Sequence, residues 1–230
     1  MISSDLPPEV LSLKDERLEA MHEAHRVDWE DVSRRLYRSS LLSSSDWVRK
    51  ARDLLATAEL VAPVVAEEWR RKKDIVKGLT QEWPQDHSAT YFMLTAFAVE
   101  NLLKGALVVL RYHEIAADFD SKPSSGKSLP KLLQSHDLMH LVRLVRKSQL
   151  RPPYSAPELS LSLEEEDLVR RLTLNAKWYG RYPIAISPRG SGDEKFSDGK
   201  VYNLRWFGEQ DVEKLKLLVA RFREELHSAS

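Results

Sequence analysis

The sequence predicts an all-α protein, an up-and-down bundle of about five helices preceded by an N-terminal helical extension. One segment, residues 88–112, is apolar on nearly every side of a helical wheel. Several other segments repeat apolar residues at helical spacing, and Pro-, Gly- or Ser-rich breaks separate them. Strand patterns are absent outside 184–207, where a short hairpin fits. We therefore expect an extension and linker at 1–45 and a bundle at 46–230 with a long loop at 184–207.

The apolar segment from Ser88 to Tyr112 is expected to be the central helix. A helix that is apolar all round is normally covered on several sides by other helices. Glu100 and Lys104 interrupt it and lie one turn apart, so they share a face. Two interpretations carry equal weight: a buried structural pair, or a polar pair that lines a ligand site. The charges would make a membrane span costly, which favours a core helix.

The first half of the chain shows one weakly and one strongly predicted helical region. Charges dominate the pattern from Glu9 to Tyr37, which predicts surface helices that need a partner. Ser45 is expected to cap the next helix, Pro63 to kink or split it, and Gly78 to end it.

The second half alternates loops and helices. We expect a loop over 118–128, a helical region over 130–147 and a last helix over 209–227. Between them, Ser162 and Glu165 have the spacing of a capping box that opens a helix reaching about Tyr179.

Composition limits the classes of function. The 230 residues are 42% hydrophobic and 30% charged, as in a soluble globular protein. Lys+Arg and Asp+Glu both number 35, so no overall field favours nucleic acid or an acidic membrane, and such contact needs a local patch. Cysteine is absent, which excludes disulfides and thiolate zinc ligands. The N-terminus has no apolar signal core, and we expect a cytoplasmic protein without membrane contact.

Three apparent motifs are weak. Gly126-Lys127-Ser128 lacks the upstream glycine of a phosphate-binding loop, because Ser121 stands at that position. His136 and His140 have zinc-ligand spacing without a third ligand, so the favoured interpretation is that Asp137 caps or pairs and His136 bonds to a neighbouring helix. The basic run at 70–73 is interpreted as a solvated helix end.

Three short motifs occur in one order along the chain: Ala98, Glu100 and Lys104 in the central helix, His136-Asp137-Leu138 at a helix start, and Trp178-Tyr179-Gly180-Arg181-Tyr182-Pro183 at a helix end. Over residues 46–227 this pattern resembles the HEPN domain, in the branch that carries Arg-Tyr-Pro after the fourth core helix. The resemblance implies a helical bundle that associates with nucleotides or RNA and often forms homodimers. We expect such a homodimer through the helix carrying Arg181 or the last helix.

The resemblance also implies a biological context. Many members are metal-independent ribonucleases, and several act beside a nucleotidyltransferase in toxin–antitoxin or defence pairs. The ribonucleases use an Arg-x(4–6)-His motif, which here matches Arg221 and His227 at the end of the chain. No cofactor or metal is implied.

The favoured function is a nucleotide- or RNA-binding accessory protein, with ligand contacts expected from Glu100, Lys104, His136, Asp137, Arg181 and Tyr182. Arg181 suits a bidentate phosphate contact or a helix cap, and Tyr182 suits base stacking or packing. One alternative is an endoribonuclease in which Arg221 and His227 are catalytic, and another is a structural helical partner. The sequence leaves open whether the protein is an enzyme.

Overall fold

A computed structural model describes residues 28–79, 87–122, 129–150, 159–176, 194–195, 201–202 and 207–227. These residues form seven α-helices, one short 3-10 helix and one pair of two-residue strands, so the all-α prediction is confirmed. The chain divides into two compact units, Met1–Ser39 and Ser40–Ser230. Helix α2 (Trp29–Leu41) forms most of the described part of the first unit, and its last two residues belong to the second unit.

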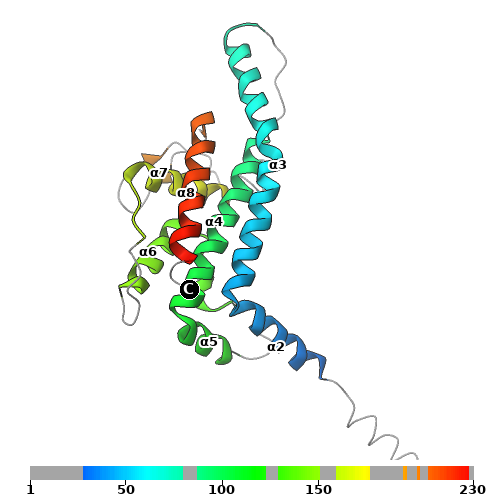
Figure 1. Cartoon of the computed structure of the whole chain (residues 1–230), viewed down its shortest axis with the longest axis vertical. Coiled ribbons are helices and arrows are strands. Elements are labelled where there is room, and N and C mark those ends of the chain that lie inside the picture. The colour runs from blue at the N-terminus through cyan, green and yellow to red at the C-terminus, as the bar shows by residue number, and fades with distance from the viewer. Residues whose placement is uncertain are drawn as a thin grey trace, which may run out of the picture. The chain divides into compact units, whose positions relative to one another are not determined.

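Helix α3 (Ser44–Val76) forms one edge of the bundle in Figure 1. Its cap is Ser43, whose hydroxyl accepts a hydrogen bond from the Asp46 N–H at 3.3 Å, so the expected cap at Ser45 is wrong. The helix continues through Pro63 without the expected split, because α3 packs along α4 on both sides of the proline and this contact holds its backbone helical. Gly78 ends it as predicted, with a φ of 73° that favours glycine.

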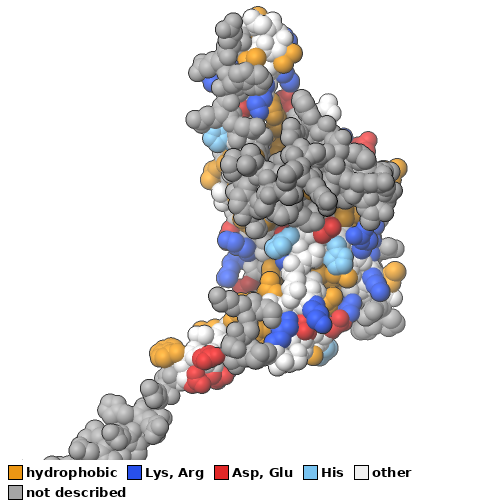
Figure 2. All heavy atoms as spheres, turned by 180° about the vertical axis from the view of Figure 1, so that it is seen from behind, with side chains coloured by type: hydrophobic (Ala, Val, Ile, Leu, Met, Phe, Trp, Pro, Cys, Tyr) orange, Lys and Arg blue, Asp and Glu red, His pale blue; other side chains and the backbone are white. Residues whose placement is uncertain are grey.

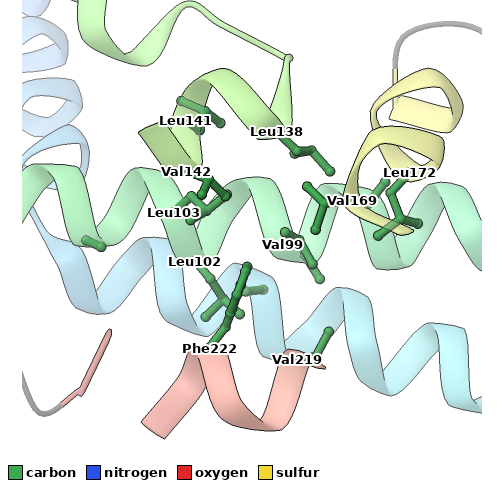
Figure 3. Close-up of a cluster of buried hydrophobic side chains, with 14 of the residues drawn as sticks. Val99, Leu102, Leu103, Leu138, Leu141, Val142, Val169, Leu172, Val219 and Phe222 are labelled. Atoms are coloured by element: carbon green, nitrogen blue, oxygen red, sulfur yellow. The ribbon is translucent and has the colours of Figure 1, made fainter. Parts of the chain in front are cut away.

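Helix α4 (Ser88–Leu110) is the central helix, and α3, α6, α7 and α8 all contact it. Figure 3 shows apolar side chains of α4 meeting those of α6, α7 and α8. The labelled members of this cluster are Val99, Leu102, Leu103, Leu138, Leu141, Val142, Val169, Leu172, Val219 and Phe222. By length and composition α4 would also suit a membrane span, but most of it is buried within the bundle, as in a core helix.

The segment after α4 is more helical than the sequence pattern indicated. Helix α5 (Tyr112–Asp120) extends into the expected loop, because Ile115, Ala116 and Phe119 are buried at helical spacing. The 3-10 helix η1 (Lys131–Leu133) follows, and its first N–H donates to the Asp118 carboxylate at 2.6 Å. The expected helical region at 130–147 is therefore a 3-10 turn followed by α6 (Leu138–Gln149).

Helix α7 (Leu163–Leu174) opens with the predicted capping box of Ser162 and Glu165. Residues 175–176 add a π-type turn, and the rest of the helix expected to reach Tyr179 lies outside the described residues. Strands β1 (Glu194–Lys195) and β2 (Val201–Tyr202) pair antiparallel, as a short hairpin would.

Helix α8 (Glu209–His227) is joined to α7 by ion pairs, of which Arg171–Asp211 is the most buried. The Arg171 guanidinium donates two hydrogen bonds to the Asp211 carboxylate, at 2.8 and 3.0 Å. The same guanidinium lies 4.8 Å from the centre of the Phe207 ring, which stacks on Phe92 of the core. This contact fixes where α8 begins.

Candidate functional site

The candidate site lies where the middle of α4 meets the start of α6. The Lys104 ammonium donates to Glu100 Oε1 at 2.7 Å within α4. His136, which precedes α6, places its Nδ1 3.0 Å from Oε1 and 3.1 Å from Oε2 of the same carboxylate. One buried carboxylate thus holds two basic side chains, and the cluster joins residues far apart in the sequence.

Burial separates the roles of the three side chains. The side chains of Glu100 and Lys104 are 8% and 3% exposed, whereas that of His136 is 49% exposed. A buried carboxylate is tolerated when a hydrogen-bonded cation accompanies it. The Glu100–Lys104 pair is therefore a buried internal pair, and His136 is the part of the cluster that meets solvent.

Glu100 also orients the His136 ring. An imidazole nitrogen next to a carboxylate carries the proton, which leaves Nε2 as the second, chemically distinct nitrogen. In the neutral ring Nε2 accepts a hydrogen bond, and in the protonated ring it donates one to an anion. The geometry therefore prepares a polar contact for a ligand at the exposed edge of His136.

Gly105 lets α3 approach this cluster. A Cβ at position 105 would lie 3.1 Å from the Trp47 Cβ and 3.4 Å from the Ser44 carbonyl oxygen, so a larger residue would have to push α3 slightly away. Trp47 in turn places its ring centre 6.0 Å from the Lys104 ammonium. This close approach buries Lys104, and the sequence analysis did not single out Gly105 or Trp47.

Asp137 has a local structural role. Its carboxylate accepts the His140 N–H at 3.0 Å and caps α6. The interpretation of Asp137 as a cap and of His136 as a partner of a neighbouring helix is confirmed. No group of three potential metal ligands occurs among the described residues, and His136 directs Nδ1 to Glu100.

Helix α6 carries a basic stripe that the sequence analysis missed, formed by His140, Arg143 and Lys147. All three side chains are exposed, and their spacing places them on one face of the helix. Arg146 lies off the stripe and pairs with Glu166 at 3.6 Å, but no ion pair within the described part of the chain involves Arg143 or Lys147. Figure 2 shows one face of the molecule on which histidine, Lys and Arg side chains gather with some acidic ones.

Several cations elsewhere in the bundle are paired with acidic side chains. In the basic run of α3, Arg70 contacts Glu67 at 2.6 Å and Lys73 contacts Glu209 at 2.5 Å. The run is thus a helix end held by ion pairs, close to the favoured interpretation. The α6 stripe differs from this run because Arg143 and Lys147 have no acidic partner among the described residues.

Of the two residues of the proposed ribonuclease motif, the structure describes the side chain of Arg221 only. Arg221 donates to Glu165 at 2.6 Å and to the Ser160 carbonyl at 2.8 Å, so its guanidinium holds α8 against the start of α7. His227 is the last residue of α8, and its side chain lies outside the described residues. Arg181 and Tyr182 lie outside them as well.

A second carboxylate–histidine contact joins α3 to α4, and sequence reasoning missed it. Glu68 is 5% exposed although it lies in a helix of many charges. Its carboxylate accepts the His87 N–H at 2.9 Å and also contacts His87 Nδ1. Glu68 thus satisfies an N–H at the start of α4, which is a role in folding.

Comparison with known proteins adds no relative: no family model matches the chain, and no curated protein or solved structure is similar to it. Fold and site therefore define the class, an all-α helical bundle with a buried Glu–Lys pair, an attached half-exposed histidine and a basic helix face.

Proposed function

We propose that this protein binds RNA or nucleotides through His136 and the basic stripe of α6. The observation that carries the proposal is the His136 ring, which a buried carboxylate holds in one orientation while half of the side chain stays exposed. The resemblance to the HEPN family favours the same class of ligand.

The chemistry of this face suits a phosphate backbone. Arg143 and Lys147 offer exposed cations without acidic partners among the described residues, and a phosphate gains most from such groups. From His140 to Lys147 the helix rises about 10 Å, enough for contacts to more than one phosphate. His136, next to the first turn of α6, adds a hydrogen bond to a phosphate or a ribose hydroxyl. The proposed ligand is therefore a single-stranded RNA or a nucleotide.

A nucleotidyltransferase partner, which the HEPN resemblance implies, and a cytoplasmic location, which the composition and the N-terminal sequence favour, belong to the same proposal. Endonucleolytic cleavage by Arg221 and His227 is less favoured, because the Arg221 guanidinium is held by Glu165 and Ser160. A cationic group held in this way has fewer donors left for a phosphate.

The test is RNA binding measured by fluorescence anisotropy with a labelled single-stranded oligonucleotide in EDTA at low salt. We expect His136→Ala to weaken binding about tenfold, the loss of one charge-assisted hydrogen bond of roughly 1.4 kcal/mol. His113→Ala is the matched control, because His113 is an exposed histidine on α5 outside the site. Equal affinity of wild type and His136→Ala would remove His136 from the site.

The same reactions, run on a denaturing gel, distinguish binding from cleavage. We expect intact RNA. Cleavage that disappears in His227→Ala would replace the binding proposal with the ribonuclease alternative.

A further inference from the structure

Helix α3 exposes a stripe with a defined pattern of charge. Its face away from α4 carries an apolar centre, Leu60 and Val64, whose exposed fractions are 79% and 45%. One end of the stripe is acidic at Asp53, and the other carries Arg71, whose guanidinium also lies 3.4 Å from Glu67 of the same helix. The spacing of the four residues of the stripe places them on one side of the helix.

The residues of the stripe are exposed on one side of α3. The residues that α3 buries against the bundle, Ala51, Ala58 and Val65, share a different face of the helix. In Figure 1, α3 runs along an edge of the bundle, so another helix has access to it. The exposed leucine and valine lie one turn apart and form a small apolar surface at the centre of the stripe.

We propose that this stripe binds the same stripe of a second copy of the chain, with the two α3 helices antiparallel. About a two-fold axis between Leu60 and Val64, each Leu60 faces Val64 of the second copy. In the same register each Asp53 faces Arg71 of the second copy, so two identical ion pairs flank the apolar centre. The surface is thus complementary to itself, as a two-fold dimer requires.

Charge excludes the main competing arrangements. A parallel pair would place Asp53, Glu67 and Arg71 against their own copies, and like charges at facing positions are destabilising. An antiparallel pair centred on Leu60 would oppose Asp53 to Glu67 and Arg49 to Arg71. The proposed register alone among these combines the apolar contact with opposite charges.

The proposal is independent of RNA binding and differs from the sequence-based expectation, which placed the dimer at the helix carrying Arg181 or at the last helix. The stripe is small, so the dimer is expected to be in rapid, concentration-dependent equilibrium with monomer. Sedimentation velocity across a wide concentration range measures this equilibrium. A wild-type protein that stays monomeric at every concentration overturns the proposal.

Charge reversal tests the register. In Asp53→Arg, an arginine at position 53 faces Arg71 of the second copy at each end of the stripe, and this repulsion is expected to abolish association. The double variant Asp53→Arg/Arg71→Asp is expected to restore it. Within one helix the two positions are about 27 Å apart, so an intrachain contact cannot explain such rescue. Glu224→Arg, an exposed acid on α8, is the control and should leave association unchanged. Loss that the double variant fails to rescue, or no loss in Asp53→Arg, contradicts the proposal.

Cross-linking gives a second, independent measurement, since the chain contains no cysteine. We expect oxidation to link Asp53→Cys protein to Arg71→Cys protein when the two are mixed, and neither to link to itself. Self-linking of Asp53→Cys would indicate a parallel pair and overturn the antiparallel register.

Discussion

At the scale of single residues, both the stability and the candidate site depend on the buried charged side chains of Glu100 and Lys104. Glu100 serves both neighbours: its carboxylate is the counter-ion of Lys104 and the anchor of His136. The two functions are linked, because the ammonium that stabilises the buried carboxylate also keeps it available to orient the imidazole. Stability and ligand binding are therefore expected to respond together to changes at Lys104.

Lys104→Met tests this link through stability. It leaves the Glu100 carboxylate buried without its cation, and we expect the free energy of unfolding to fall by roughly 3–5 kcal/mol. Urea denaturation measures the change. In the double variant Glu100→Gln/Lys104→Met the loss should be smaller, since no buried charge remains. Arg35→Met, which breaks an exposed pair with Asp31, is the control and should cost about 0–1 kcal/mol. A Lys104→Met protein as stable as wild type would contradict the buried-pair account.

At the scale of helices, the α7–α8 joint illustrates how an ion pair fixes one element against another. Burial alone would raise the pKa of Asp211, but hydrogen bonds from Arg171 and the Gly208 N–H and the Arg171 charge together lower the pKa below its usual value. Burial alone would lower the pKa of Arg171, but the hydrogen bonds and charges of Asp211 and Asp167 raise it above its usual value. The lowered Asp211 pKa means that the folded state prefers the ionised carboxylate.

This preference predicts a pH-dependent effect of Asp211→Asn. The contribution of Asp211 is fully present above the ordinary carboxyl pKa of about 4 and is lost as the pH falls through the lower folded-state pKa. We expect the variant to lose about 1–3 kcal/mol at pH 7, from charge-assisted hydrogen bonds, and much less near pH 2. Urea denaturation at both pH values measures the difference.

The chain offers a matched control for that experiment. Glu164 and Lys214 also join α7 to α8, at 3.1 Å, but the Glu164 side chain is 78% exposed. Glu164→Gln should therefore change stability little at either pH. A loss for Asp211→Asn that is the same at pH 7 and pH 2 would show that its charge is not what stabilises the joint.

At the scale of the whole molecule, the features that could be predicted from the sequence are those that local sequence patterns determine. The apolar run of α4, the Ser162–Glu165 capping box and the Gly78 helix end each follow from residues close together in the chain. Asp137 as a cap followed from the same kind of local rule. These features set the all-α class and the position of most helices.

Features that depend on distant contacts could not be predicted. The α6 stripe is basic in sequence, but only the packed structure shows that Arg143 and Lys147 face solvent while Arg146 meets Glu166. Arg221 matched a motif, yet its partners come from residues about sixty positions earlier. Burial and long-range pairing decide which charged residues remain available for a ligand.

The salt dependence of RNA affinity tests the central claim, that the α6 face binds phosphate, most directly. In Arg143→Gln/Lys147→Gln two cations are lost, and the slope of log affinity against log salt should become shallower by about 1.4. Arg70→Gln/Lys73→Gln, at cations paired with Glu67 and Glu209, is the control and should keep the wild-type slope. A wild-type slope in Arg143→Gln/Lys147→Gln would contradict the account.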